Sequence, residues 1–189
     1  MKNNERAKIK TDTKIKDAEI NVVKADKNAA SSLRELFIDA LKDIFWAENA
    51  LIKALPKMAA NATSPNLKSG IVDHHAITIN QVERLKEVFD LIGEPAEGKK
   101  CEAIEGIIKE GENMLQETAL GAVRDAAIIA SSQKIEHYEI AAYGTLHTFA
   151  KVLGENDAAK LLQQTLAEEK ESDKILTDIA NISVNMKAV

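Results

Sequence analysis

Apolar side chains recur every three or four residues along most of this 189-residue chain. That spacing places them on one face of an α-helix, and no stretch shows the period-two alternation of a half-buried strand. The chain has only 8 Gly and 3 Pro residues, so few points interrupt a helix. Five helices are expected, over residues 32–62, 64–92, 101–115, 122–153 and 158–180.

Capping signals mark where the first two helices begin. Ser32-Leu33-Arg34-Glu35 matches a capping box, in which Ser32 accepts from a free backbone N–H and Glu35 reaches back. Ser64-Pro65 pairs an N-cap residue with proline at the first helical position. Pro56 lies inside the first apolar stripe and predicts a kink in that helix rather than its end.

The connections predict how the helices are arranged. Short links join the first two long helices and the last two, so each pair is expected to form an antiparallel hairpin. The segment between residues 92 and 122 contains the short helix and is long enough to return along the bundle. The expected fold is an all-α, ferritin-like four-helix bundle with one long crossover. We expect a polar Lys-rich tail at 1–31, the bundle at 32–182 and a C-terminal tail at 183–189.

Charge and composition narrow the class of protein. Residues 1–29 carry eight Lys/Arg and five Asp/Glu, whereas residues 30–189 carry seventeen and twenty-five, so only the tail could attract nucleic acid. The single cysteine, Cys101, excludes an internal disulfide and a Cys-based zinc site, and is interpreted as a small buried apolar residue. No run approaches the roughly 20 apolar residues of a membrane span, and the start lacks a secretory signal. We therefore expect a cytoplasmic protein.

Acidic residues interrupt the apolar stripes near the middle of three helices. They are Glu48, Glu136, Glu139, Glu169 and Asp173. These side chains should meet at one level of the bundle, where each buried carboxylate loses several kcal/mol of hydration and no Lys or Arg shares the stripe. Protonation, water or a metal ion could compensate, and bundles that hold pairs of iron or manganese ions use such carboxylates. In the alternative interpretation, each carboxylate is a boundary residue whose head reaches water.

The helix expected at 64–92 has no carboxylate on its inner stripe at that level. His74 or Gln81 could supply one neutral ligand there, although His74 could equally be a hydrogen-bonded core histidine. Tyr143, one turn beyond Glu139, could donate to a carboxylate or could pack in the core with its hydroxyl satisfied.

Several motifs carry a family resemblance that covers residues 33–180. They are Leu36–Ile44 with Ala47-Glu48, Ala54–Met58, Gln81–Leu85, Lys100–Gly106, Glu136–Gly144 and Leu166–Asp173. Through them the chain resembles the YciF-like ferritin-like stress proteins of bacteria. The resemblance implies a rubrerythrin-like bundle, commonly a homodimer, with metal-site residues Glu48, Glu136, Glu139 and Glu169. Asp173 also matches the family's pattern in the last helix.

One position departs from that family. Its second helix often reads His-Leu-x-Glu-Thr, and here His74 and Thr78 match while Ile77 stands in place of the glutamate. Because isoleucine cannot coordinate a metal, one or two Fe or Mn ions, or none, are the expected cofactors.

Four functions remain open from the sequence, and whether the protein is an enzyme is left undecided. The first is a stress protein with a di-iron-type carboxylate site that would oxidise Fe(II) or consume a small oxidant such as peroxide. The second is a non-catalytic dimeric bundle that has lost the metal and acts structurally or through a partner. The other two are a protector held on DNA by the tail, which the low tail charge disfavours, and a manganese catalase. No membrane partner is expected.

Overall fold

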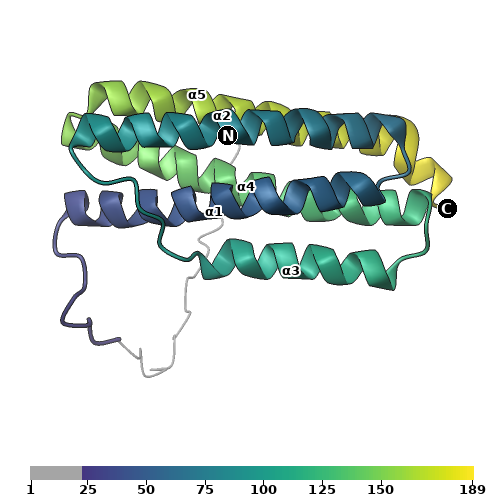
Figure 1. Cartoon of the computed structure of the whole chain (residues 1–189), viewed down its shortest axis with the longest axis horizontal. Coiled ribbons are helices and arrows are strands. Elements are labelled where there is room, and N and C mark those ends of the chain that lie inside the picture. The colour runs from purple at the N-terminus through teal and green to yellow at the C-terminus, as the bar shows by residue number, and fades with distance from the viewer. Residues whose placement is uncertain (1–22) are drawn as a thin grey trace, which may run out of the picture.

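The computed structural model describes residues 23–189, and from Leu33 to Lys187 the chain is helical except for the connections (Figure 1). The elements are α1 (Leu33–Asn61), α2 (Pro65–Ile92), α3 (Glu102–Glu117), α4 (Ala122–Leu153), α5 (Asn156–Ile179), η1 (Ala180–Val184) and η2 (Asn185–Lys187). No strand occurs between residues 23 and 189, so the predicted all-α fold is confirmed. Of the tail expected at 1–31, residues 1–22 lie outside the described part, and residues 23–31 are exposed.

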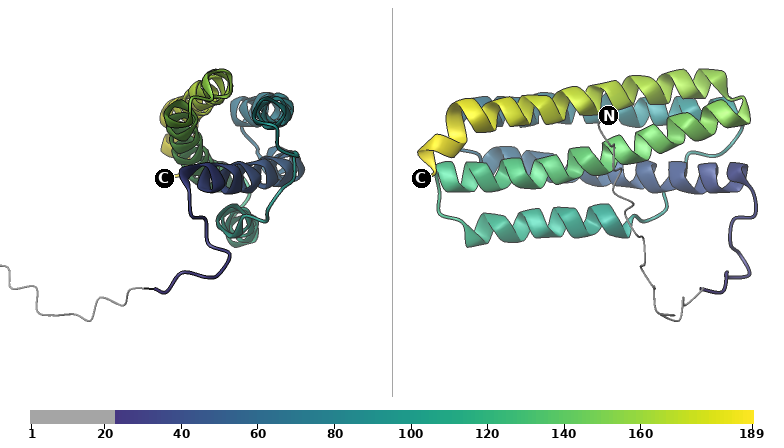
Figure 2. Two further views of the ribbon diagram at one scale, coloured as in Figure 1. Left: turned by 90° about the vertical axis from the view of Figure 1, so that its left-hand side faces the viewer. Right: turned by 180° about the vertical axis from the view of Figure 1, so that it is seen from behind.

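Four helices form the bundle, and α3 packs outside it. Contacts run from α1 to α2, from α2 to α5, from α5 to α4 and from α4 back to α1, which closes a ring of four. The two hairpins, α1–α2 and α4–α5, lie lengthwise beside each other (Figure 2). The crossover places α3 against α4 and α1. The ferritin-like arrangement expected from the connection lengths is therefore the observed one.

The helix ends follow the capping signals, with one difference in detail. Ser32 Oγ accepts from Glu35 N at 3.2 Å, but Glu35 Oε2 reaches back to the N–H of Ser31 at 2.6 Å, one residue before the cap. Ser64 Oγ accepts from Leu67 N, and α1 continues through Pro56.

The C-terminal end of the bundle extends further than expected. The π-helical turn η1 follows α5 without a break, and η2 follows η1. Val184, in the segment expected to be a tail, is 2% exposed and belongs to the core.

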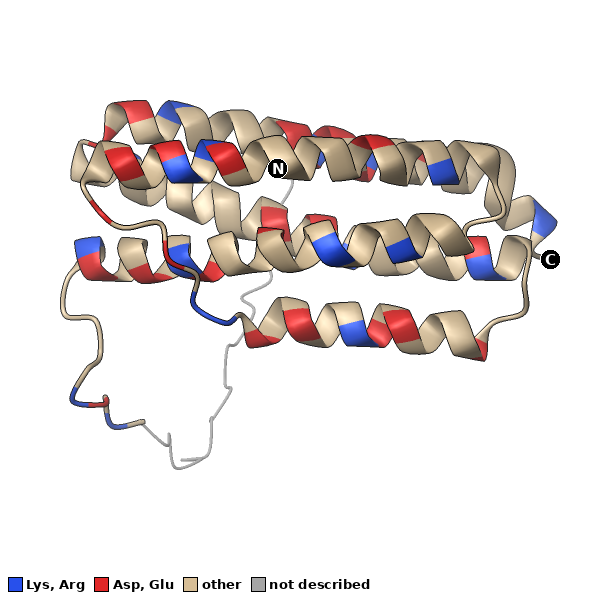
Figure 3. Cartoon of the chain, viewed as in Figure 1, with Lys and Arg blue, Asp and Glu red and all other residues tan. Residues whose placement is uncertain are grey.

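Charged residues are interspersed on the outer surfaces of the helices. In the ribbon of Figure 3, the Lys and Arg positions, drawn blue, are interspersed along the helices with the Asp and Glu positions, drawn red. Apolar side chains fill most of the interior of the bundle. On α1, Phe37, Leu41, Ile44 and Leu51 are completely buried.

Asp125, in the first turn of α4, ties this helix to the turn between α1 and α2. Its carboxylate accepts from Thr63 N at 2.7 Å, from Thr63 Oγ1 at 2.6 Å and from Ser64 N at 2.8 Å. The side chain of Asp125 is buried, so water cannot readily replace these donors at its carboxylate. This contact fixes the end of the first hairpin against the second.

Replacement of Asp125 by alanine is expected to lower the free energy of unfolding by about 2–4 kcal/mol, because it removes three hydrogen bonds that a buried carboxylate accepts from the turn between α1 and α2. Urea unfolding followed by circular dichroism measures this loss. The matched control is Asp178→Ala on α5, an exposed position where a change within about 0.5 kcal/mol is expected. Equal stability of the two variants would contradict the structural role of Asp125.

Candidate metal centre

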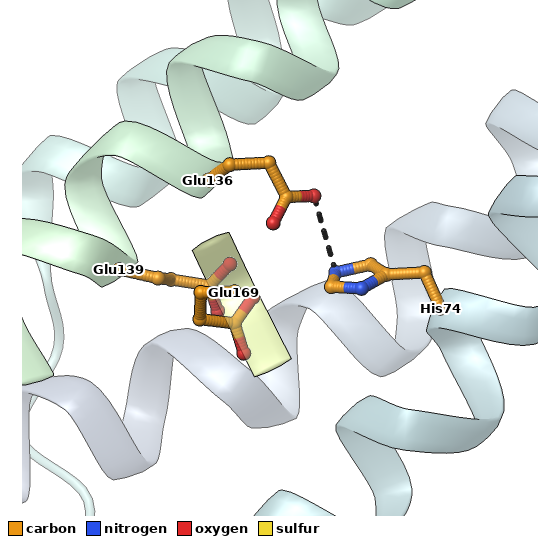
Figure 4. Close-up of side chains that lie close together, drawn as sticks. All are labelled: His74, Glu136, Glu139 and Glu169. Atoms are coloured by element: carbon orange, nitrogen blue, oxygen red, sulfur yellow. Dashed lines mark ion pairs between the residues drawn. The ribbon is translucent and has the colours of Figure 1, made fainter. Parts of the chain in front are cut away.

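Four buried side chains from three helices converge in the middle of the bundle (Figure 4). His74 comes from α2, Glu136 and Glu139 from α4, and Glu169 from α5, and one ligand atom of each lies within 4.8 Å of the others. None of the four is more than 7% exposed. The expectation that these carboxylates meet at one level is thus met for three of them, with His74 beside them.

The same residues contain buried polar atoms that make no hydrogen bond within the described part of the chain. These atoms are His74 Nε2, Glu136 Oε2, Glu139 Oε2 and Glu169 Oε2, together with Glu48 Oε2 and Gln81 Oε1 nearby. A buried polar atom without a partner costs about 1–3 kcal/mol, so such atoms are rare in folded proteins. Their concentration at one point fits a site in which the carboxyl groups either share protons, as between Glu48 and Glu139 and between Glu136 and Glu169, or surround a cation.

Burial determines the protonation of the carboxyl groups. Desolvation, reinforced by the charge of Glu169, raises the pKa of Glu136 to about 10 and that of Glu48 to about 8. Desolvation also raises the pKa of Glu169 to about 7, and it raises that of Glu139 well above its usual range. Without a cation, most of these groups hold a proton near pH 7. A bound cation would displace the protons and favour the ionised form.

Ser172 orients the imidazole of His74. The Nδ1 atom lies 3.0 Å from Ser172 Oγ, and Nε2 lies 3.4 Å from Glu136 Oε1. Burial lowers the pKa of His74 to about 4, so the ring is neutral at pH 7 and its contact with Glu136 joins two uncharged groups. When Nδ1–H donates to Ser172, Nε2 presents its lone pair to the carboxylates, which is the form that binds a metal.

Glu48 of α1 lies fully buried beside the four-residue group but is not a member of it. Its Oε1 accepts a hydrogen bond from the hydroxyl of Tyr143, the contact that the spacing of Tyr143 from Glu139 left open. Glu48 is therefore held at the edge of the site with its second oxygen unpartnered among the described residues.

Gln81 performs the corresponding role for Glu169. Its Nε2 donates to Glu169 Oε1 and lies 3.2 Å from Glu168 Oε2. Glu168 in turn pairs with Arg84 at 2.7 Å. The side-chain amide, which could have been a ligand from the sequence alone, thus links a buried carboxyl group to an ion pair nearer the surface.

Asp173 and Ile77 lie next to the group without joining it. The carboxylate of Asp173 accepts from Gln133 at 3.1 Å and lies 3.4 Å from His137 Nε2, with 24% of its side chain exposed. Ile77 lines a pocket together with His74 and Glu136. Ser172, which the sequence reasoning passed over, is one turn from Glu169, and that spacing was the signal that could have identified it.

The fold and this buried group define a ferritin-like bundle with an acidic core. Residues 32–189 match the family described as Domain of unknown function (DUF892), and the chain belongs to that family. It is 43% identical over 158 residues to protein YciF of Escherichia coli (strain K12), covering 83% of this chain and 95% of YciF. The resemblance drawn from the motifs is therefore confirmed.

Solved structures agree with this assignment. The crystal structure of the E. coli stress protein YciF matches with a TM-score of 0.80 and 42% identity, over 82% of this chain and 99% of that one. The structure of YcfI from Rhodopseudomonas palustris matches with a TM-score of 0.78 and 40% identity, over 81% of this chain and 98% of that one. A protein from Xanthomonas campestris pv. campestris, at 21% identity and a TM-score of 0.65 over 79% and 92%, shares the fold. Among residues 23–189, none of the helices has the length and apolar character that crossing a bilayer requires.

The metal-free protein is expected to lose stability as the pH rises from about 6.5 to about 8. In this window the unfolded chain has released its carboxyl protons, while burial keeps the pKa of Glu136 near 10 and that of Glu48 near 8. The folded state then binds more protons, so the free energy of unfolding falls by about 1.4 kcal/mol per pH unit for each proton retained. Below about 6.5 the lowered pKa of His74 acts in the opposite direction.

Urea unfolding of the metal-free protein at several pH values tests this expectation. Glu136→Gln cannot ionise in either state, so its stability should depend less steeply on pH than that of the wild type. Identical slopes for the two proteins would contradict the proposed protonation of Glu136.

Proposed function

We propose that this protein is a bacterial stress-response protein that binds at least one Fe or Mn ion through His74, Glu136, Glu139 and Glu169. The observation that carries the proposal is the set of four buried ligand atoms within 4.8 Å of one another. Three carboxylates with one neutral imidazole form a donor set suited to these ions. The link to stress comes from the relative YciF, which is described as a stress protein.

The residues of the chain prepare the site without the ion. Ser172 holds His74 with Nε2 toward the carboxyl groups, Gln81 holds Glu169, and Tyr143 holds Glu48. Such outer contacts fix the orientation of ligands and raise metal affinity. A bound Fe or Mn ion would supply redox chemistry toward small oxidants.

The composition of the second helix favours one ion rather than two. In two-metal bundles, two helices each supply a Glu-x-x-His pair and the other two each supply a Glu. Here α2 offers His74 alone, because Ile77 stands where the family pattern His-Leu-x-Glu-Thr has its glutamate, and Glu48 lies outside the four-residue group. A second ion would therefore lack a carboxylate from α2.

Metal analysis of protein purified without a metal-affinity tag, after anaerobic loading with Fe(II) or Mn(II), tests the site. About one ion per chain is expected for the wild type, and Glu136→Gln should weaken the affinity at least about tenfold. Glu171→Gln, on the exposed side of α5, is the matched control and should bind as the wild type does. Equal metal content in all three proteins would contradict the assignment of Glu136.

Restoring the missing carboxylate tests the stoichiometry. Ile77→Glu should raise the metal content above one ion per chain, because it places a carboxylate one turn from His74. Ile77→Gln, of similar size without the charge, should leave the content near one. A metal content in Ile77→Glu no higher than in Ile77→Gln would overturn the explanation based on Ile77.

The isoleucine that this chain has at position 77, in place of the family's glutamate, supports a second candidate function, a non-catalytic bundle that acts structurally or through a partner. In that case Ile77 marks a site that has lost its metal, and the buried carboxyl groups stay protonated. Metal below about a tenth of an ion per chain after loading would favour this candidate. The expected homodimer stays a prediction, which light scattering of the full chain would check.

A further inference from the structure

A small pocket lies between α2, α4 and α5, with Leu55 of α1 also in its wall, beside the candidate metal centre. Its volume is about 100 Å³. Most of its wall is aliphatic and consists of Leu55, Ile71, Ile77, Ile135, Ile175 and Leu176. His74 and Glu136 also line it, so the pocket reaches the four-residue group.

One wall of the pocket carries a hydroxyl group without a partner. Ser132 of α4 lines the pocket, is 3% exposed, and its Oγ makes no hydrogen bond within residues 23–189. A serine inside a helix often donates to the carbonyl four residues earlier, and Ser132 does not. His74 Nε2 and Glu136 Oε2, on residues of the same lining, are also unpartnered there. The pocket thus combines an aliphatic wall with polar atoms that can hydrogen-bond an occupant.

The boundary between α2 and α5 is the side on which the pocket approaches the surface. Ile175 is 43% exposed and Asp73 is exposed, and both contribute to the lining. A Cβ atom at Gly70 would lie 3.4 Å from Ile179 Cδ1 and 3.9 Å from Ile175 Cγ2, so glycine leaves space between the two helices. Ile77 adds another apolar side chain to the lining.

We propose that this pocket binds a small uncharged molecule of two to four non-hydrogen atoms that has one hydrogen-bonding end, and that it leads this molecule to His74 and Glu136. The volume sets the size, because a water molecule in the liquid occupies about 30 Å³ and the pocket has room for about three. The aliphatic wall disfavours an ion, which would lose hydration there, and the carboxyl group of Asp73 in the lining would repel an anion. Ser132 receives the polar end. Binding is independent of the metal, whereas delivery to the site rests on the proposed function.

Two probes distinguish the aliphatic wall from the polar end. Xenon tests the wall alone, and ethanol, with three non-hydrogen atoms and one hydroxyl group, tests both. Isoleucine methyl signals of the full chain as purified are followed by NMR, and the metal content of the same sample is measured. Saturable shifts of the Ile71, Ile77, Ile135 and Ile175 methyl groups are expected, with Kd for ethanol no tighter than about 1 mM.

Two variants and one control make the proposal falsifiable. Ser132→Ala should weaken ethanol about fivefold and leave xenon unchanged, because it removes one hydrogen bond and little volume. Ile77→Phe should fill the pocket and abolish both sets of shifts, whereas Ile79→Phe, at a position that does not line it, should leave both intact. If Ile77→Phe fails to fold, the comparison of xenon with ethanol in Ser132→Ala still decides.

The results separate this proposal from the metal site. Absence of saturable shifts with both probes in the wild type overturns the pocket as a binding site. Ethanol affinity unchanged in Ser132→Ala overturns the polar end. Shifts that persist in protein that takes up less than about a tenth of an ion per chain after anaerobic loading with Fe(II) or Mn(II) support the pocket while contradicting the proposed metal binding, so the two failures are distinguishable.

Discussion

Burial of several acidic side chains at one level of a helical bundle is the constraint on which the rest of this structure depends. Each of the four core glutamates loses its hydration, and within residues 23–189 no Lys or Arg contacts their carboxyl groups. A core of this kind folds only where apolar layers above and below supply the stability. The long aliphatic stripes of α1, α4 and α5 provide those layers, and Asp125 fixes the ends of the two hairpins. The helices therefore work as a frame for a group that opposes folding.

Two neighbouring glutamates on α5 show how finely position decides charge. Burial raises the pKa of Glu169 to about 7. Burial alone would also raise the pKa of Glu168, but the hydrogen bonds and charge of Arg84 bring it below its usual value. Gln81 donates to both carboxyl groups and so joins the inner residue to the outer ion pair. Arg84 pairs with Glu168 and not with its neighbour Glu169, so the carboxyl group of Glu169 has no ion-pair partner in the described part of the chain and could bind a metal cation.

Periodicity predicted the helices and the convergence of Glu136, Glu139 and Glu169, because residues at the centre of an apolar stripe face the core. Periodicity could not decide whether Ser172 or Asp173 faces the site, because both lie near the apolar stripe and a helix with 3.6 residues per turn places neither at its centre. In the structure, Ser172 contacts His74, whereas Asp173 contacts Gln133 and His137. Gln81 was similarly ambiguous, because its role depends on which neighbours on α5 its amide meets. Contacts between helices, which spacing within one helix does not encode, decided both cases.

Ile77 links the candidate metal centre with the pocket beside it, because it lines that pocket together with His74 and Glu136. A glutamate at this position would add a ligand one turn from His74, and it would also place a charged group in the aliphatic lining. Isoleucine does the reverse, since it removes a ligand and keeps the approach to His74 and Glu136 apolar. The same side chain thus weakens the case for a second ion and favours entry of an uncharged molecule. The residue at position 77 therefore affects both the number of metal ions bound and the entry of a small molecule into the pocket, so both properties should change together in variants of Ile77.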